Sequence, residues 1–282
     1  MSKLKVFTKS KTLLINELSR QVELDFLDDK QALQTQLDVY FHSGSLDEKA
    51  INLIKNAKTV ITNSKSAKAE ISDKMDIDTT KVNVIYPAVR QAVIKPKEAR
   101  KQLCSELEID KKTRIIFFTA RVLKTNGIKE FFDTIVALNS TNYKIIIASD
   151  EQQIQTLKFQ IAKYKLEDKV IFYENFNNMD LLYAACDIYV LPTYVKNFSL
   201  NVLKAMSLKT AVFVSSQNSA KEIVDVFATM ESPTDPNTSF KIDALLRSKD
   251  DLKLIKKQNY KVSKEFYVQK QMQRLLRVLN IT

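Results

Sequence analysis

Apolar residues recur along this chain in short runs that alternate with segments of helical periodicity. Short continuous apolar runs are typical of buried parallel strands, whereas apolar positions three and four apart mark one face of a helix. In the first part of the chain, this alternation predicts strands over residues 3–8, 22–27, 37–42, 58–62 and 81–86, with helical segments between most of them. The pattern therefore predicts an α/β domain built from short units.

The alternation stops between residues 91 and 100, where lysines and a proline interrupt the apolar period. We interpret this segment as an interdomain linker. Beyond it, longer apolar runs predict strands over residues 114–119, 143–148, 169–172, 187–191 and 210–214. Such runs are typical of a sheet that is covered on both faces. We expect a second, doubly wound domain, and a tail of two amphipathic helices that packs back on the body of the protein.

Residues 181–216 form the clearest unit of this second domain. They predict the end of a helix, a buried strand, a turn opened by Pro192, a helix over residues 200–207 and another strand. Strand, loop, helix and strand in this order make one right-handed crossover of a parallel sheet. Because ligands of such sheets bind where strand ends meet helix N-termini, the loop of residues 192–199 is the first candidate for a binding site.

Composition adds few constraints to this picture. Hydrophobic residues at 45% and charged residues at 27% are ordinary for a globular protein, and no apolar run is long enough to span a membrane. The N-terminus lacks a signal-peptide core, so we expect a cytoplasmic protein. Cys104 and Cys186 stand apart on helical ground, which favours buried thiols over a disulfide or a metal site. A single histidine, His42, excludes a histidine-rich metal centre.

The chain is strongly basic and poor in glycine. A net charge of +11 and a pI near 9.4 favour polyanionic partners such as anionic lipid head groups, nucleic acid or phosphorylated substrates, although an AT-rich genome would also enrich lysine. The lysines are scattered rather than gathered in an arm or patch, so we expect no nucleic-acid partner. Gly44 and Gly127 are the only glycines, which excludes glycine-rich phosphate loops.

From about residue 57 to the C-terminus, several segments follow one another in the order seen in a known family. They are VITNSKSAKAEI with KVNVIYPAV, FFTARVLKTNGIKEFFDTIVAL, LEDKVIFYENF, LLYAACDIYVLPTYVKNFSLNVLKAMS and SSQNSAKEIV. This order resembles the retaining glycosyltransferases of the two-Rossmann-domain type, known as group 1 or family four. The resemblance implies an α/β fold with two Rossmann-like domains (GT-B): a shortened acceptor domain over residues 1–92 and a full nucleotide-sugar (donor) domain over residues 93–282, with the C-terminal helices packing back.

The resemblance also implies a donor site after the first strand of the donor domain. The family typically places an arginine and a lysine there, and the protein must stabilise the charge that develops on a departing diphosphate. The arginine position is Arg121 in this sequence. The lysine position falls on Asn126, with Lys124 two residues earlier as a possible substitute.

The largest departure from the family lies in the loop of residues 192–199 and the helix after it. The family carries two glutamates there: the first orders the transferred sugar, and the second accepts hydrogen bonds from the ribose hydroxyls. Both positions are lysines here, and an ammonium group only donates. Lys196 and Lys204 either hold phosphate or an acidic sugar, or are solvated residues of a decayed site. The residues expected at this part of the donor site are Lys196, Asn197, Phe198, Ser199, Leu200 and Lys204.

Two further residues match positions near the family's reaction centre. Glu222 matches a glutamate at a helix N-terminus that faces the donor sugar, although an acidic residue there also suits the helix dipole. His42 ends a predicted strand of the acceptor domain, where family members often carry a histidine, and it is the candidate catalytic residue. The alternative for His42 is a partly exposed histidine at a strand end.

The resemblance implies a glycosyltransferase that moves a sugar from a nucleotide-diphosphate sugar to a glycan or lipid-linked acceptor in envelope polysaccharide synthesis. It implies no cofactor or metal besides the donor substrate. The basic charge suits peripheral contact with an anionic membrane. The alternative function is a catalytically silent relative that serves as a binding or partner subunit, which the lysines at both glutamate positions favour.

Overall fold

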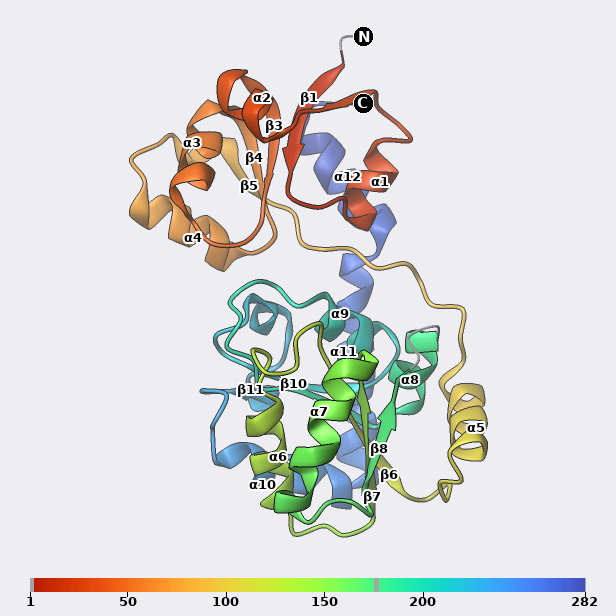
Figure 1. The fold of residues 1–282 in the computed structure, drawn as a ribbon. Helices are drawn as coiled ribbons and strands as arrows, with labels where there is room; N and C mark the ends of the chain where they lie inside the picture. Colours follow the sequence, from red (N-terminus) through yellow and green to blue (C-terminus); the bar gives the residue numbers. More distant parts are fainter. Residues whose placement is uncertain (1–2, 175–177, 282) are drawn as a thin grey trace. The chain divides into compact units, whose positions relative to one another are not determined.

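A computed structural model describes residues 3–174 and 178–281 of the protein and divides the chain into two compact units (Figure 1). The first unit contains the chain up to Arg90 and the chain from Glu265 onward. The second unit is the continuous segment Gln91–Lys264. Each unit is built around its own parallel β-sheet, which confirms the predicted α/β class with two Rossmann-like domains.

The first unit is a five-stranded parallel sheet in the order β2-β1-β3-β4-β5. Its strands are β1 (Leu4–Thr8), β2 (Leu24–Phe26), β3 (Leu37–His42), β4 (Ala57–Thr62) and β5 (Val82–Val84). Its helices are α1 (Leu13–Leu18), α2 (Asp29–Gln34), α3 (Glu48–Asn56), α4 (Lys65–Lys74), the short 3-10 helix η1 (Thr79–Lys81) and the C-terminal helix α12 (Val268–Val278).

The helices between these strands begin at polar residues that cap them. Each cap side chain accepts a hydrogen bond from a backbone amide of the first helical turn, which satisfies a donor that has no partner within the helix. The caps are Thr12, Asp28, Asp47 and, for α4, Ser64. These side chains set where each helix starts and thereby how short each loop is.

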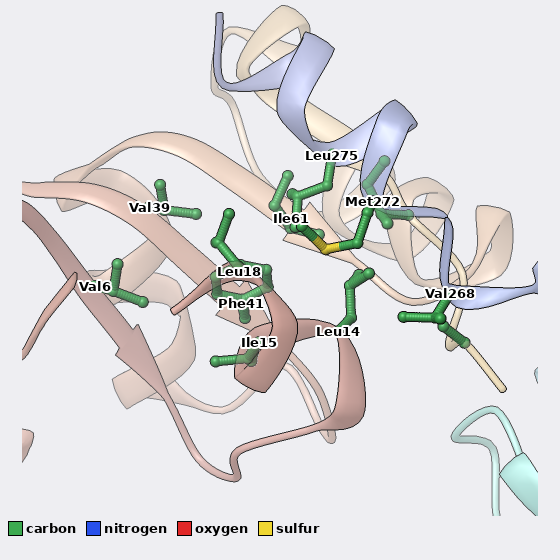
Figure 2. Packing of buried hydrophobic residues seen from close by; sticks show 12 residues of the cluster. Val6, Leu14, Ile15, Leu18, Val39, Phe41, Ile61, Val268, Met272 and Leu275 are labelled. Atoms are coloured by element: carbon green, nitrogen blue, oxygen red, sulfur yellow. The ribbon is translucent and has the colours of Figure 1, made fainter. Parts of the chain in front are cut away.

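Alternate residues of the central strands point to opposite faces of this sheet, and each face has its own apolar core. Figure 2 shows the core beneath α1 and α12, where Val39 and Phe41 of β3 pack with Met272 and Leu275. Tyr40, between the two β3 residues, belongs to the opposite core, which α2, α3 and α4 cover. This alternation is what a strand with a side-chain period of two requires when both faces are buried.

The C-terminal helix corrects the expected domain division. We expected residues 93–282, including both tail helices, to form the second domain, but the structure groups α12 with the first unit. Without α12, the face of the first sheet beside α1 would expose apolar side chains. The chain leaving this unit also pairs with the chain returning to it: Val89 N donates to Phe266 O at 3.1 Å, and Val268 N donates to Val89 O at 3.0 Å.

The second unit is a six-stranded parallel sheet in the order β11-β10-β9-β6-β7-β8. Its strands are β6 (Arg114–Thr119), β7 (Tyr143–Ala148), β8 (Val170–Tyr173), β9 (Ile188–Leu191), β10 (Ala211–Ser215) and β11 (Thr229–Met230). Its helices are α5 (Pro96–Glu106), α6 (Ile128–Val136), α7 (Glu151–Ile161), α8 (Met179–Ala185), α9 (Leu200–Ser207), α10 (Asn237–Arg247) and α11 (Lys249–Ser263), with the 3-10 helices η2 (Ala162–Tyr164), η4 (Ser219–Ile223) and η5 (Val226–Ala228); η6 (Lys264–Phe266) precedes α12.

The expected linker over residues 91–100 is shorter in the structure, because α5 already begins at Pro96. A proline at the first helical position is favourable, since its missing amide hydrogen would have no helical partner. Ala99 and Leu103 of α5 are buried, so the second half of the expected linker is the start of a helix that packs on the unit.

A buried carboxylate aligns β9 beside β6. Asp187 is 7% exposed, and its Oδ2 accepts a hydrogen bond from Ile115 N at 3.0 Å. Lys256 and Arg100 lie 2.8 and 3.2 Å from its two oxygens. Burial alone would raise the pKa of Asp187, but the attraction of Lys256 and Arg100 and these hydrogen bonds outweigh it, so the pKa is lowered. The carboxylate therefore stays ionised and fixes the neighbouring ends of the two strands.

The sequence predicted two buried thiols, and the structure agrees. Cys104 and Cys186 are free and buried. Among the described residues, no helix combines the length and apolar character needed to cross a bilayer. Nor do three or more histidine, cysteine or carboxylate side chains gather in the described ranges as a group that could hold a metal ion.

Candidate functional site

The candidate site lies at the carboxyl edge of the six-stranded sheet, where the strand order reverses. β6, β7 and β8 follow one another in one direction, and the chain then returns to place β9 on the other side of β6, with β10 beyond it. Ligands of open parallel sheets bind at the point of reversal, beyond the carboxyl ends of the strands. The loops that follow β6 and β9, residues 120–127 and 192–199, therefore frame the site.

Gly127 brings these two loops into direct contact. Its φ of +81° lies in the left-handed region, and a Cβ atom built on it would stand 1.8 Å from the carbonyl oxygen of Pro192. Only glycine permits that approach. Beside it, Thr193 Oγ1 donates to Asn126 Oδ1 at 2.9 Å. One of the two glycines in the chain thus stands where the loops meet.

Arg121 and Lys124 extend from the first loop into solvent. The loop is tied to α7, because Leu123 N donates to Gln153 Oε1 at 2.7 Å and Gln153 Nε2 donates to Arg121 O at 3.1 Å. Both cationic side chains are exposed, and neither forms an ion pair with a carboxylate in the part of the chain that the structure describes. They are available to an anionic ligand.

The side chain of Asn126, which was expected to contact the ligand, forms hydrogen bonds within the protein. Its Nδ2 donates to Val122 O at 2.8 Å, while its Oδ1 accepts from Thr193. The side chain is half-buried. The structure therefore gives Asn126 a positioning contact between the two loops.

A third loop, after β10, holds the loop of residues 192–199 through Asn218. This side chain is 1% exposed and uses both ends of its amide. Its Nδ2 donates to Val195 O at 2.8 Å and to Asn197 O at 2.6 Å, and its Oδ1 accepts from Ser199 N at 3.1 Å. Asn218 was not among the residues expected from the sequence. An asparagine before a helical turn signals a cap, and Oδ1 does accept from Ala220 N at 3.0 Å, but that signal does not reveal the contacts across loops.

The residues expected on this loop differ in how deeply their side chains are buried. Lys196 and Asn197 are exposed, and Ser199 is half-buried at the start of α9. Phe198 is 8% exposed, so its ring is buried. Leu200, the first residue of α9, is 37% exposed.

Lys204 lies on the face of α9 that looks toward the end of β6. Asn201, three residues before it, donates through Nδ2 to Thr119 O at 3.4 Å. Residues three and four apart share a helix face, and long side chains of a helix point back toward its N-terminus. Lys204, half-buried and one turn after Leu200, thus belongs to the same edge of the sheet as Arg121.

Glu222 and His42 belong to other segments of the chain. Glu222 is half-buried in η4, which follows β10 and the Asn218 loop. His42 ends β3 of the first unit and is 4% exposed, not partly exposed as its alternative predicted. Tyr40 Oη lies 3.1 Å from His42 Nδ1. Burial, with a smaller contribution from Lys9, lowers the pKa of His42, so its imidazole is neutral at neutral pH.

The architecture matches solved structures over almost all of its length. Alr3699/HepE of Anabaena, in complex with UDP, has a TM-score of 0.83 at 14% identity, with 99% of this chain and 100% of that one covered. A glycosyltransferase of Rickettsia africae has a TM-score of 0.74 at 16% identity, covering 98% and 89% of the two chains. These likenesses establish the two-Rossmann-domain (GT-B) fold.

The sequence then identifies the family. Residues 99–262, more than half of the chain, match the family described as Glycosyl transferases group 1. The chain belongs to this family. The matched segment contains the three loops of the candidate site.

Two characterised relatives are similar over part of their length. The O-antigen chain mannosyltransferase RfbU of Salmonella typhimurium is 24% identical over 186 residues, which cover 64% of this chain and 49% of RfbU. The N,N'-diacetylbacillosaminyl-diphospho-undecaprenol alpha-1,3-N-acetylgalactosaminyltransferase of Campylobacter jejuni is 30% identical over 131 residues, 45% of this chain and 33% of the relative. The similarity thus spans half or less of each relative.

Proposed function

We propose that this chain is a glycosyltransferase that binds a nucleotide-diphosphate sugar at the strand-order reversal of the second unit and transfers the sugar to a glycan or lipid-linked acceptor. The observation that carries the proposal is the meeting of the Arg121 loop and the Lys196 loop at that point, within the segment matched by the family. The acceptor class follows the two relatives, one named for O-antigen chains and one for a diphospho-undecaprenol substrate. Envelope polysaccharide synthesis is the process that we infer.

The exposed cations suit the chemistry of sugar transfer. When the bond between the sugar and the diphosphate breaks, negative charge builds on the departing diphosphate. Arg121 can donate two parallel hydrogen bonds to phosphate oxygens, and Lys124 adds a second positive charge on the same loop. The first turn of α9 has no acidic residue and no side-chain cap, so its N-terminal end favours an anion. Retention of configuration follows from family membership and is part of the proposal.

The nucleotide is proposed from the structural neighbours. HepE has been solved with UDP, with UDP and glucose and with UDP-glucose, so uridine nucleotides are the first ligands to test. His42 stays our candidate catalytic residue in the first unit. Its neutral imidazole is in the state that accepts a proton or a hydrogen bond.

The positive charge of the chain suits an acceptor at a membrane surface. A net charge of +11 would attract the protein to anionic head groups, where lipid-linked acceptors reside. We therefore propose that the protein acts on the cytoplasmic side in peripheral contact with the membrane.

A catalytically silent binding subunit is the second candidate function. Lys196 and Lys204 favour it, because they stand where the family carries two glutamates. A silent relative would keep the fold and bind a nucleotide or a partner without releasing the sugar.

Calorimetric titration with the diphosphates of uridine, guanosine and adenosine and with their sugars tests the donor site. We expect one nucleotide to bind, and Arg121→Ala to weaken that binding by about 1.5 to 3 kcal/mol, as for a hydrogen bond to a charged group. Lys257→Ala, an exposed lysine of α11, is the matched control and should leave affinity unchanged. No binding at millimolar concentration would refute the donor site. Binding without release of nucleoside diphosphate in the presence of acceptor lipids would favour the silent subunit.

A further inference from the structure

Four positive side chains lie on the segments that follow β6 and β9, and none has an ion-pair partner in the described residues. Arg121 and Lys124 follow β6, whereas Lys196 and Lys204 follow β9, and within residues 3–174 and 178–281 none of the four forms an ion pair. Elsewhere in this unit cations do find partners: Lys129 lies 2.7 Å from Asp133, and Lys158 lies 3.0 Å from Glu174. Like charges on one edge repel one another unless an anionic ligand neutralises them.

The backbone that carries Lys196 is held in place before any ligand binds. Ser219 donates to Lys196 O twice, from its backbone N and from its Oγ, both at 2.9 Å. The carbonyls on either side, of Val195 and Asn197, accept from Asn218 at 2.8 and 2.6 Å. These contacts fix three consecutive carbonyls from beneath and leave the Lys196 side chain exposed. A charge on a fixed backbone binds an anion with less loss of conformational entropy than one on a loose loop.

A diphosphate alone leaves part of this charge unmatched. Arg121 and Lys124 on the first loop are suited to the diphosphate of a nucleotide sugar. The ammonium groups on the other side of the site, on the loop and helix after β9, then still lack a counter-charge. Glu130 beside this loop is already engaged, since it accepts from Tyr194 Oη at 3.1 Å. A further anionic group on the ligand would supply the missing charge.

We infer that the donor of this site carries a carboxylate on its sugar, as in a hexuronic acid, and that Lys196 binds this carboxylate. This inference rests on the proposed function and specifies its substrate class. A carboxylate accepts hydrogen bonds from the ammonium group and also pairs with its charge, whereas a hydroxymethyl group at the same position accepts a hydrogen bond but carries no opposite charge. Lys196 is thus a specificity-determining residue, and Lys204 adds to the positive potential.

Matched pairs of ligands test the inference. UDP-glucuronate differs from UDP-glucose only in the carboxylate at C6, and GDP-mannuronate differs from GDP-mannose in the same way. In calorimetric titrations we expect the acidic member of the pair whose nucleotide binds to be favoured about tenfold, the size of one charge-assisted hydrogen bond. Lys196→Gln should abolish this preference, because it should weaken the acidic member of the pair more than the neutral member. Lys257→Gln on α11 should change neither.

The outcomes separate this inference from the proposed function. If the nucleotide binds but the acidic and neutral sugars bind with equal affinity, the inference of an acidic donor is wrong, whereas the proposed donor site stands. Equal weakening of both members by Lys196→Gln also overturns it, because Lys196 would then hold the nucleotide. If none of the nucleotides or their sugars binds, the proposed function fails and the acidic donor fails with it. Since Lys196 is exposed, an unchanged thermal melt should show that the variant folds.

Discussion

Gly127 and Asn218 show how single residues shape the candidate site. Gly127 lets the loop after β6 touch the carbonyl of Pro192, and Asn218 satisfies carbonyl and amide groups of the same second loop from the opposite side. Neither residue needs to touch a ligand. Together they fix the backbone positions from which the exposed side chains of Arg121 and Lys196 extend.

Gly127→Ala should destabilise the second unit and weaken nucleotide binding together. The left-handed backbone alone costs an alanine about 1–3 kcal/mol, and the new Cβ would also push Pro192 away. Chemical unfolding and calorimetric titration measure the two effects. Gly44→Ala, at a φ of +103° but with its nearest contact a flexible lysine at 3.8 Å, is a control for backbone strain without a loop collision. Unchanged nucleotide affinity in Gly127→Ala would mean that the contact with Pro192 does not shape the site.

His42 should make the first unit less stable as the solution becomes acidic. Burial lowers the pKa of His42 in the folded chain. At a pH above the ordinary histidine pKa, the imidazole is therefore neutral in both the folded and the unfolded chain. As the pH falls through about 6.5 toward the lowered folded pKa, the unfolded chain takes up the proton more readily and the free energy of unfolding falls. Because the chain has one histidine, the change in the free energy of unfolding over this pH range comes mainly from His42.

Urea unfolding between about pH 7.5 and 5.5 measures this effect, since the ordinary histidine pKa lies within that range. We expect the midpoint of the first unit to move to lower urea on acidification. His42→Gln should show a smaller shift over the same range. An equal shift in the variant would assign the pH dependence to other groups.

At the scale of elements, most strands and the two tail helices were predictable, but the sheet that the last helix covers was not. Residues 37–42 and 114–119 are apolar runs bounded by turn residues. They were predicted as strands, and the structure shows them as β3 and β6. The two residues of β11 and the helix α10 carry no comparable apolar run and went unpredicted. The amphipathic face of α12 predicted a buried helix, but periodicity does not say which sheet it covers.

Leu275→Ala tests the placement of α12. Leu275 is fully buried in the core that α12 shares with α1 and the first sheet, so the truncation should cost about 2–5 kcal/mol. Hydrogen exchange resolved by peptide should show faster opening of β1 and β3 and no change in β6 and β7. Leu33→Ala, at a 43% exposed leucine of α2, is the matched control and should alter stability by less than about 0.5 kcal/mol. Faster exchange in β6 rather than β3 would contradict the division of the chain.

At the scale of the molecule, sequence order pointed to candidate residues, and the structure shows the contacts that surround them. Arg121, Lys196 and Lys204 are candidates because the family order places them after β6 and β9, and parallel strands bring their carboxyl ends to one edge. The contact between Asn126 and Thr193 was not predicted, because spacing does not show which side chain reaches the amide of Asn126. Asn218 was missed because its partners lie on a loop about twenty residues earlier, and pairing over that distance depends on the folded sheet.

A crystal structure of the protein with UDP tests the central claim, a nucleotide site at the strand-order reversal of the second unit. We predict that the diphosphate lies against the first turn of α9, with the Arg121 guanidinium in hydrogen-bond contact with a phosphate oxygen and the loop of residues 192–199 unchanged in its contacts with Asn218. UDP bound away from the carboxyl ends of β6 and β9, or no bound UDP at millimolar concentration, would contradict the account.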